Sequence, residues 1–237
     1  MSSLYKNSLL LFSLAAFIAC KKNDELLING QYKPASTVTI DAVVMLTKEG
    51  QITKTSLIKE FVQRHGQQDY FLFDKRTDPT DNNSSTLRLD FHEDGTVDTY
   101  YMNESASSKG KISQRTSSYI DITAIESAIM PIGPNPNRCG VLMENASSPT
   151  PSKTLRDLSS TGYSSYYEFY PTGRLEIRNG QLYVPLMALL VHSKGQDQTC
   201  LSASAGSFRT FNNEIKKQLQ PGDTIVYQSK RVMLIKP

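Results

Sequence analysis

Apolar and polar side chains alternate one by one over long parts of this chain. From residue 37 to residue 47, every even position is apolar and most odd positions are polar. The same period of two runs through residues 87–91 and 97–101, which a turn containing Gly95 separates. Because successive side chains of a strand point to opposite faces, this pattern predicts antiparallel strands with one buried and one solvated face.

Two turn sequences predict further hairpins. Residues 166–169 and 175–177 alternate on either side of Pro-Thr-Gly at 171–173, where glycine supplies a positive φ for the return of the chain. Asn179-Gly180 follows directly and is a strong signal for a two-residue turn, because both residues tolerate a positive φ.

The last third of the chain predicts a buried strand and a closing hairpin. Residues 182–191 are apolar on both faces, which is typical of a strand covered on both sides, with Pro185 at an edge or bulge. Residues 225–227 and 232–235 flank Ser229-Lys230 and predict two strands joined by a turn.

Two short amphipathic helices interrupt the predicted strands. Thr53 or Thr55 can cap the first, which stops at Gly66, and its apolar face consists of Leu57, Ile58, Phe61 and Val62. The second precedes Pro221-Gly222 and carries a stripe at four-residue spacing, formed by Phe211, Ile215 and Leu219. Each helix is suited to cover one face or one end of a sheet.

The segment from residue 145 to residue 165 is rich in serine and contains Pro149 and Pro151. Few of its residues are apolar, so little burial would offset the entropy lost on ordering it. The composition predicts a mobile surface loop near 145–165. This loop either borders a binding site or is only a solvated connection between elements.

Together these elements predict a mainly β fold in a single domain over residues 32–237. The expected architecture is an antiparallel β-barrel or β-sandwich of hairpins with two short helices. Alternation combined with turns such as Asp94-Gly95-Thr96 also resembles the lipocalin-like lipoproteins of Bacteroidota. That resemblance implies a barrel, and it identifies no ligand-binding residues.

The first residues have the features of a secretory signal. Lys6 and the free amine supply positive charge, and residues 9–19 form an apolar run interrupted only by Ser13. A run of this length is too short to cross a bilayer as a helix. It ends at Ile18-Ala19-Cys20, which resembles the lipobox of bacterial lipoproteins, whose cysteine is diacylated and becomes N-terminal after cleavage.

The lipobox resemblance implies a signal peptide at 1–19, lipid attachment at Cys20 and a linker at 20–31. The alternative is an ordinary signal peptide that contains a cysteine. Residues 21–25, of which all but Asn23 are charged, complete the sequence CKKNDE, which resembles the start of many Bacteroidota outer-membrane lipoproteins. This second resemblance implies a membrane-anchored protein of the outer membrane, at its periplasmic or cell-surface face.

Lipidation of Cys20 would leave Cys139 and Cys200 as an even pair in an oxidising compartment. We therefore predict a disulfide between them, with both at strand ends. Two buried free thiols are the main alternative, and a catalytic thiol is the least favoured, because nothing marks either cysteine as activated.

Charge and motifs argue against several functions. The formal net charge is +3, from 26 Lys and Arg against 23 Asp and Glu, which lacks the basic excess needed to bind nucleic acid. There is no G-x-S-x-G elbow, H-E-x-x-H motif, P-loop or G-x-G-x-x-G sequence. The histidines, His65, His92 and His192, are interpreted as structural or solvated.

Two sets of carboxylates invite a functional hypothesis. Glu168 and Glu176 flank a turn and could serve as a glycosidase acid and nucleophile, although outward-facing strand positions ordinarily carry such residues. A second set invites a calcium site, but the turn already accounts for its Asp-Gly pair; it consists of Asp90, Glu93, Asp94 and Asp98.

The sequence therefore predicts no catalytic residues, no metal site and no cofactor. The expected function is non-enzymatic: an outer-membrane lipoprotein that binds a small ligand or an envelope partner. The rival interpretation is a structural or accessory subunit of an envelope complex without a ligand of its own, and a hydrolase is a distant third. The chain has 12 tyrosines and no tryptophan, which makes a sugar-binding platform less favoured.

We predict that Cys20→Ser abolishes lipid attachment, because serine provides no thiol for acylation. The variant should leave the membrane fraction or accumulate as an uncleaved precursor, as seen by fractionation and intact-mass analysis. Cys139→Ser serves as the matched control and should stay in the membrane fraction. A mature N-terminus elsewhere in the wild-type protein, without acyl mass, would contradict the prediction.

Overall fold

The computed structural model describes residues 28–73, 87–101, 106–131, 137–156, 165–195 and 199–237. The predicted signal peptide, Cys20 and most of the linker lie outside the described residues.

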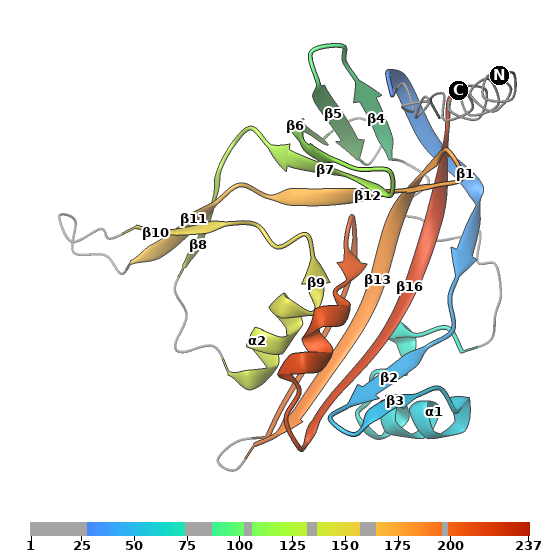
Figure 1. Ribbon diagram of the computed structural model, residues 1–237, viewed down its shortest axis with the longest axis vertical. Helices are drawn as coiled ribbons and strands as arrows, with labels where there is room; N and C mark the ends of the chain where they lie inside the picture. The colour runs from blue at the N-terminus through green and yellow to red at the C-terminus, as the bar shows by residue number, and fades with distance from the viewer. Residues whose placement is uncertain (1–27, 74–86, 102–105, 132–136, 157–164, 196–198) are drawn as a thin grey trace, which may run out of the picture.

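Eight strands form a closed antiparallel barrel (Figure 1). Each strand pairs with the next one in chain order, and the first pairs with the last, which removes the free edges of an open sheet. The predicted mainly β fold is confirmed, and the barrel is the alternative that is present. Its strands are β1 (Gly30–Ile40), β4 (Arg88–Phe91), β5 (Thr96–Tyr101), β6 (Ala106–Arg115), β7 (Tyr119–Ala124), β12 (Thr172–Arg178), β13 (Gln181–Lys194) and β16 (Asp223–Ile235).

The remaining elements are inserted between barrel strands. Between β1 and β4 lie β2 (Val44–Thr47), β3 (Gly50–Ile52), α1 (Thr55–Arg64) and the 3-10 helix η2 (Gln68–Tyr70). Between β7 and β12 lie β8 (Ala128–Pro131), α2 (Arg138–Asn145), β9 (Ser147–Ser148), β10 (Lys153–Arg156) and β11 (Tyr166–Phe169). Between β13 and β16 lie β14 (Thr199–Ser207), β15 (Thr210–Phe211) and the 3-10 helix η3 (Asn213–Gln218).

Strands β13 and β16 extend beyond the barrel into a second sheet (Figure 1). They pair without interruption from Tyr183 opposite Met233 to Ser193 opposite Asp223. Outside the barrel, β13 pairs with β14, and β16 pairs with β2, which in turn pairs with β3. The order β14-β13-β16-β2-β3 therefore forms a lower sheet whose central strands are also barrel strands.

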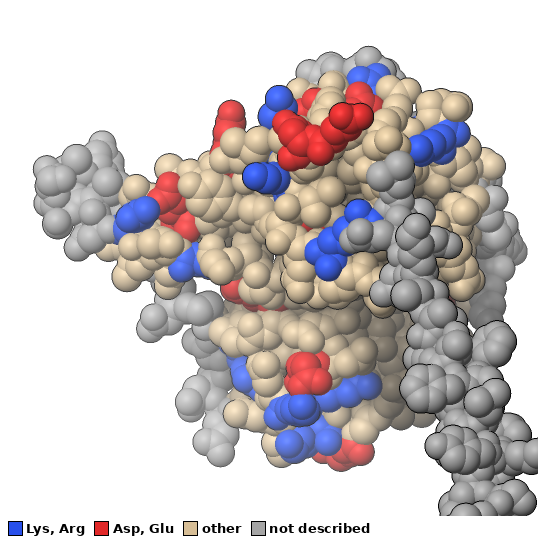
Figure 2. Space-filling model, turned by 45° about the horizontal axis from the view of Figure 1, so that its top comes forward, with Lys and Arg blue, Asp and Glu red and all other residues tan. Residues whose placement is uncertain are grey.

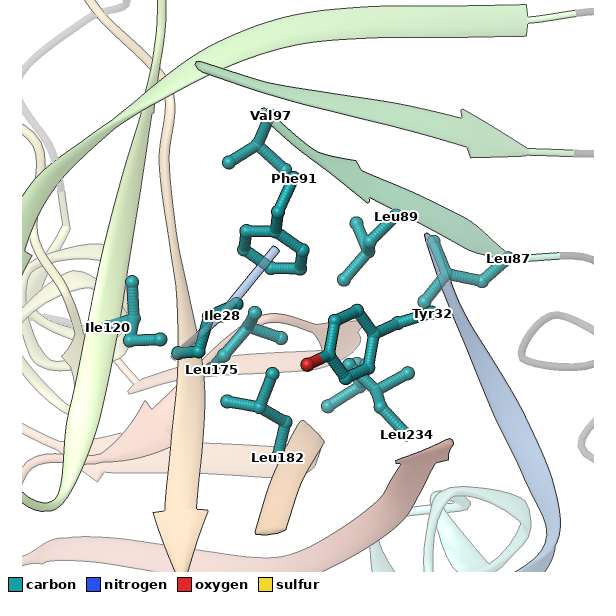
Figure 3. Packing of buried hydrophobic residues seen from close by; sticks show 11 residues of the cluster. Ile28, Tyr32, Leu87, Leu89, Phe91, Val97, Ile120, Leu175, Leu182 and Leu234 are labelled. Carbon is teal, nitrogen blue, oxygen red and sulfur yellow. The ribbon is translucent and has the colours of Figure 1, made fainter. Parts of the chain in front are cut away.

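The barrel interior is filled by side chains (Figure 3). Tyr32 and Phe91 meet edge to face at 5.5 Å between ring centroids, and aliphatic side chains from the surrounding strands fill the rest. Barrels of this size hold either a packed core or one small ligand. The almost fully buried aliphatic side chains of this barrel core are Leu89, Val97, Ile120, Leu175, Val184 and Leu234.

Helices cover both faces of the lower sheet. Met187, Leu189 and Val191 of β13 pack on one face against α2 and η3. The intervening Ala188 and Leu190 pack on the other face against α1. This alternation confirms the prediction that residues 182–191 form a strand covered on both sides.

Pro185 lies where β13 changes its neighbour. Before it, Tyr183 pairs with β12, and after it, Leu186 pairs with β14. Its carbonyl accepts a hydrogen bond from the Phe208 N–H at 2.7 Å. The N–H and C=O of one strand residue point to the same side, so the nitrogen of Pro185, which carries no hydrogen, faces the gap between β12 and β14. Proline therefore costs no hydrogen bond between strands at this position.

A small three-stranded sheet projects from the barrel as an arm, with the order β10-β11-β8 (Figure 1). We call it the arm below. The predicted hairpin around residues 171–173 is wrong, because β11 belongs to the arm whereas β12 belongs to the barrel. The loop predicted near 145–165 is likewise corrected at β9 and β10, which pair with β15 and β11; residues 157–164 lie outside the described residues.

Two other strand predictions are wrong at the place where the chain passes from the barrel to the lower sheet. The single strand expected at 37–47 is broken into β1 and β2 at residues 41–43, where Asp41 donates its N–H to the Ser229 carbonyl at 2.9 Å. The closing hairpin expected at 225–235 is one strand, because β13 pairs with it throughout.

The hairpins at Gly95 and Asn179-Gly180 are confirmed, with φ values of 79° at Gly95, 50° at Asn179 and 73° at Gly180. Both predicted helices are also present, as α1 and as the 3-10 helix η3. Helix α2 was not predicted, because its eight residues mix apolar side chains with glycine and no clear stripe.

We expect Gly222→Ala to destabilise the fold by about 2 kcal/mol or more. Gly222 has a φ of 91°, and a Cβ there would lie 2.7 Å from the Lys194 carbonyl oxygen, whose own residue donates its N–H to Gly222. Gly206→Ala is the matched control, because a Cβ there meets nothing within 4 Å. Urea unfolding of both variants checks the prediction, and equal midpoints would contradict it.

Candidate functional site

A cleft of about 420 Å³ lies between the arm, α2 and the lower sheet. Its floor comes from β13 and β14, its outer wall from α2 and the segment that follows it, and its roof from the arm. Apolar and polar side chains line it in similar number, but most of the surface they expose to the cleft is apolar, and three of them are methionines, which adapt their shape readily. They are Met130, Met143, Glu144, Ser147, Thr150, Pro151, Lys153, Phe169, Met187, Leu189, Ser204, Ser207 and Arg209, with Gly206 beside them.

Strand register places the apolar lining. In the arm, Lys153 lies opposite Phe169, and Met130 lies opposite Tyr167, so Lys153, Phe169 and Met130 share the face that overhangs the cleft. In the lower sheet, Ser204 lies opposite Leu189 on the face that carries α2. The roof and floor thus follow from alternation in two separate sheets.

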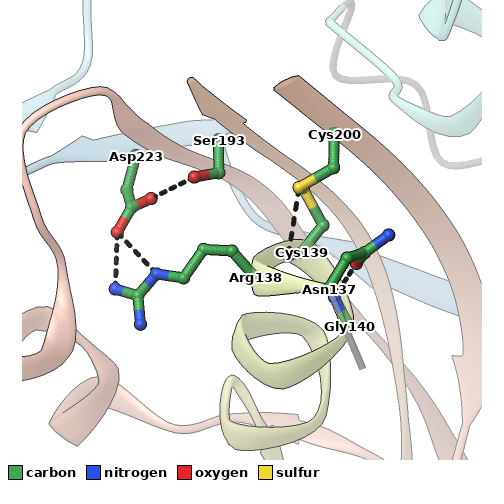
Figure 4. The surroundings of a disulfide bond; sticks show 7 residues. All are labelled: Asn137, Arg138, Cys139, Gly140, Ser193, Cys200 and Asp223. Carbon is green, nitrogen blue, oxygen red and sulfur yellow. Dashed lines mark hydrogen bonds and ion pairs between the residues drawn. A yellow bond between two sulfur atoms is a disulfide. The ribbon is translucent and has the colours of Figure 1, made fainter. Parts of the chain in front are cut away.

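Helix α2 is fixed to the lower sheet at its first turn (Figure 4). The predicted disulfide between Cys139 and Cys200 is present, with Cα atoms 5.9 Å apart. It joins α2 to β14 and closes a loop of 61 residues, for which loop entropy alone gives about 4 kcal/mol of stabilisation. Cys139 lies in a helix rather than at a strand end, and Asn137 caps this helix by accepting the Gly140 N–H at 2.9 Å.

A buried ion pair reinforces the same attachment (Figure 4). Arg138 donates to Asp223 at 2.6 Å, and Ser193 donates to the other Asp223 oxygen at 2.7 Å. Burial acts to raise the pKa of Asp223, but hydrogen bonds from Arg138, Ser193 and the Gln220 N–H outweigh it, so the pKa lies below its ordinary value.

The mouth of the cleft carries a second ion pair. Lys153 on β10 lies 2.8 Å from Glu144 on α2. This pair links the arm to the helix across the opening and neutralises the cation at the rim. In contrast to the buried pair of Asp223, it is partly solvated and contributes little to stability.

Arg209 lines the cleft where it borders a second hollow. Its guanidinium is half-buried and donates to the carbonyl oxygen of Pro149. Burial lowers its pKa from the ordinary value, although an arginine side chain stays charged. Within the described part of the chain, no carboxylate pairs with it.

The residue before Arg209 fixes its position. Phe208 has a φ of 61°, which is rare for a bulky residue. Its N–H donates to the Pro185 carbonyl at 2.7 Å, and its carbonyl accepts the Arg174 N–H at 2.9 Å, so it bridges β13 and β12 where they separate. A Cβ on Gly173 would lie 3.0 Å from that of Phe208, so a larger residue there would fit only if Phe208 shifted by a few tenths of an ångström.

A second hollow of about 280 Å³ lies on the barrel side of Phe208 and Arg209. Hydroxyl groups and one lysine supply much of its lining, from Thr99, Tyr101, Ser108, Lys109 and Thr172. Arg209 and Ser207 line both hollows. Arg209 therefore stands between two hollows that both combine apolar surface with a few polar groups.

The histidines lie away from the cleft. His65 and His192, far apart in sequence, place their rings 4.7 Å apart beside Phe61. Burial lowers the pKa of His192, and the neighbouring His65 and Lys194 lower it further. His92 contacts Asp98 at 2.9 Å on the barrel surface.

The two carboxylates considered for glycoside hydrolysis are not brought together as a hairpin pair. Glu168 lies in the arm, where it accepts from Arg156 at 2.7 Å. Glu176 lies in the barrel, where it accepts from Arg178 at 2.7 Å and from Arg231 at 2.9 Å. Each carboxylate is engaged by arginine in a separate sheet.

The acidic residues at 90–98 lie on β4, β5 and their turn. Figure 2 shows carboxylates gathered with basic side chains beside them at the top of the molecule. Asp98 contacts His92, and Asp94 accepts the Thr96 N–H at 2.9 Å, as the turn requires. In the residues that the structure describes, no group of three or more His, Cys, Asp or Glu side chains could hold a metal ion.

None of the residues that line the cleft was a candidate in the sequence. Their signals are weak, because methionines and serines in separate segments have no common spacing. The apolar stretch Cys139–Met143 and the Met in residues 182–191 indicated burial only.

Comparison of the chain with protein-family models, with curated proteins and with solved structures finds no match. Of the helices in the described residues, none has the length and apolar character needed to span a membrane.

We expect Asp223→Asn to lower the free energy of unfolding by about 2 kcal/mol at pH 7, because a charge-assisted hydrogen bond to Arg138 is lost. Since the pKa of Asp223 is lowered by folding, its contribution is present above the unfolded pKa, near 3.9, and is lost as the pH falls through the folded value. The difference in stability between wild type and variant should therefore begin to shrink as the pH falls below about 4, and it should vanish only below the folded pKa.

Urea unfolding between pH 3 and pH 7 measures this difference. Glu214→Gln is the control, because its ion pair with Lys217 is exposed and should contribute nothing measurable. A difference between wild type and Asp223→Asn that stays constant over this pH range would contradict the prediction.

Proposed function

We propose that this protein is an outer-membrane lipoprotein that binds a small, largely apolar ligand in the cleft between the arm, α2 and the lower sheet, without catalysing a reaction. The observation that carries the proposal is the cleft itself. Its volume of about 420 Å³ lies within the range of small-molecule sites, and such sites combine apolar walls with a few polar groups.

An apolar ligand that enters the cleft would displace water from apolar surface. Met143, Met187, Leu189 and Phe169 present apolar surface that an apolar molecule would remove from solvent. Each buried methylene contributes about 0.8 kcal/mol to such binding. The disulfide and the Arg138–Asp223 pair hold α2 in place, so the site is largely formed before binding.

Two features support the location. The sequence around Cys20 resembles a lipobox, and two acyl chains attach a protein stably to a membrane. The Cys139–Cys200 disulfide agrees with an oxidising compartment such as the periplasm or cell surface. Binding of this kind requires no metal and no cofactor.

The rival function, an accessory subunit that docks on an envelope partner, also has an observation in its favour. The arm exposes two large aliphatic side chains, Ile129 at 66% and Leu155 at 58% of their surface. The register places them on opposite faces of the arm, so they offer two separate apolar contacts to a partner rather than one patch. We favour the ligand site because the cleft is concave and its walls come from several elements.

We expect Ser204→Trp to abolish binding of an apolar probe, because the indole would fill the cleft from its floor. Ala205→Trp is the matched control, since Ala205 lies opposite Ala188 and places the same side chain on the other face of β14. Fluorescence titration with N-phenylnaphthylamine should show saturable binding to wild type and to Ala205→Trp, with at least a tenfold loss in Ser204→Trp.

Equal binding by the two tryptophan variants would place the probe elsewhere and contradict the proposed site. No saturable binding by the wild-type protein would leave the docking function as the better explanation. Circular dichroism and thermal unfolding of each variant show whether the fold is retained.

A further inference from the structure

We propose that the cleft selects anionic amphiphiles, namely molecules with a single alkyl chain and a carboxylate or phosphate head, and that Arg209 binds the head. This inference rests on the proposed ligand-binding function and names the class of ligand. It is carried by the position of Arg209, by its partners and by the other charges around the cleft.

Arg209 differs in its partners from three other partly buried arginines, each of which binds a carboxylate. Arg138 pairs with Asp223, Arg174 makes two hydrogen bonds to Asp121, and Arg231 makes two to Asp41. Within the described residues, Arg209 donates only to the Pro149 carbonyl. A guanidinium carries five N–H donors, so most of those of Arg209 remain available to an anion.

A half-buried cation without a carboxylate is costly, because part of its hydration is lost without a compensating charge. An anionic head would supply that charge, and carboxylate and phosphate oxygens match the planar fork of arginine. Burial, which lowers the pKa of this group, is the same desolvation that would strengthen its attraction to an anion.

The surroundings favour Arg209 over the other cation of the cleft. Lys153 at the mouth is already neutralised by Glu144 at 2.8 Å. The alkyl chain would lie along Met143, Met187 and Leu189, and the head would lie at Arg209. Because Arg209 also lines the second hollow, hydroxyl groups such as those of Thr99 and Ser108 are available near the head, among apolar side chains.

Backbone geometry holds the arginine in place. Phe208 is bonded on one side to Pro185 and on the other to Arg174, at 2.7 Å and 2.9 Å. Its ring packs with the barrel core, so the following residue emerges at the boundary between the two hollows. A head group would therefore meet a guanidinium whose backbone is already positioned.

The test compares three ligands with the same ten-carbon chain: decanoate, decyl phosphate and decanol. Their affinities for the full-length protein, measured by calorimetry and by displacement of N-phenylnaphthylamine, should differ by at least tenfold in favour of one or both anions. Arg209→Gln should weaken binding of the favoured anion by tenfold to a hundredfold, because a charge-assisted hydrogen bond is lost. The affinity of Arg209→Gln for decanol should equal that of the wild type. Retained binding of decanol would also show that the variant is folded.

Arg64→Gln is the matched control, since it removes the same charge from an exposed site on α1. It should bind all three ligands as the wild type does. The anion that binds more tightly distinguishes a carboxylate from a phosphate head. If decanol binds wild type as tightly as both anions, this inference is wrong and the proposed function stands. If none of the three ligands binds, both this inference and the proposed ligand-binding function are wrong.

Discussion

The continuous pairing of β13 with β16 is the interaction on which the two parts of the molecule depend. The ladder runs from Tyr183 opposite Met233 to Ser193 opposite Asp223, so the same two strands close the barrel and form the centre of the lower sheet. At the crossing, the buried Gln228 side chain donates to the Asp41 and Leu72 carbonyls and accepts the Leu72 N–H. These bonds satisfy a buried polar group that would otherwise be costly, and they tie the inserted segments to the shared strands.

The cleft follows from that sharing. Where β13 leaves the barrel, its neighbour changes from β12 to β14, and these two strands diverge around Pro185. Phe208 fills the gap from the barrel side, and Arg209 follows it at the boundary of the cleft. The barrel itself has a packed interior, and the cleft lies outside it, where the inserted arm and α2 meet the lower sheet.

The distribution of charge adds a second physical constraint. Most arginines whose contacts are known are matched by carboxylates, either across strands, as Arg174 with Asp121, or between elements, as Arg138 with Asp223. Such pairs limit the cost of removing charge from water and fix the relative positions of strands and helix. Arg209 departs from this arrangement in the described residues, and the proposed class of ligand rests on that departure.

The sequence by itself determined the β class, the hairpins at Gly95 and Asn179-Gly180 and the helix α1, because alternation and turn residues act locally. The pairing of Cys139 with Cys200 was favoured only on the expectation that Cys20 is lipidated, and free thiols stayed an alternative until the structure brought the two cysteines together. Only the tertiary structure decided that residues 225–235 form one strand, that β11 and β12 part into different sheets, and that Met143, Met187 and Arg209 line one cleft. The reason is that a strand's partners, and the change of partners at Pro185, depend on contacts between segments far apart in the chain, which no local pattern of side chains records.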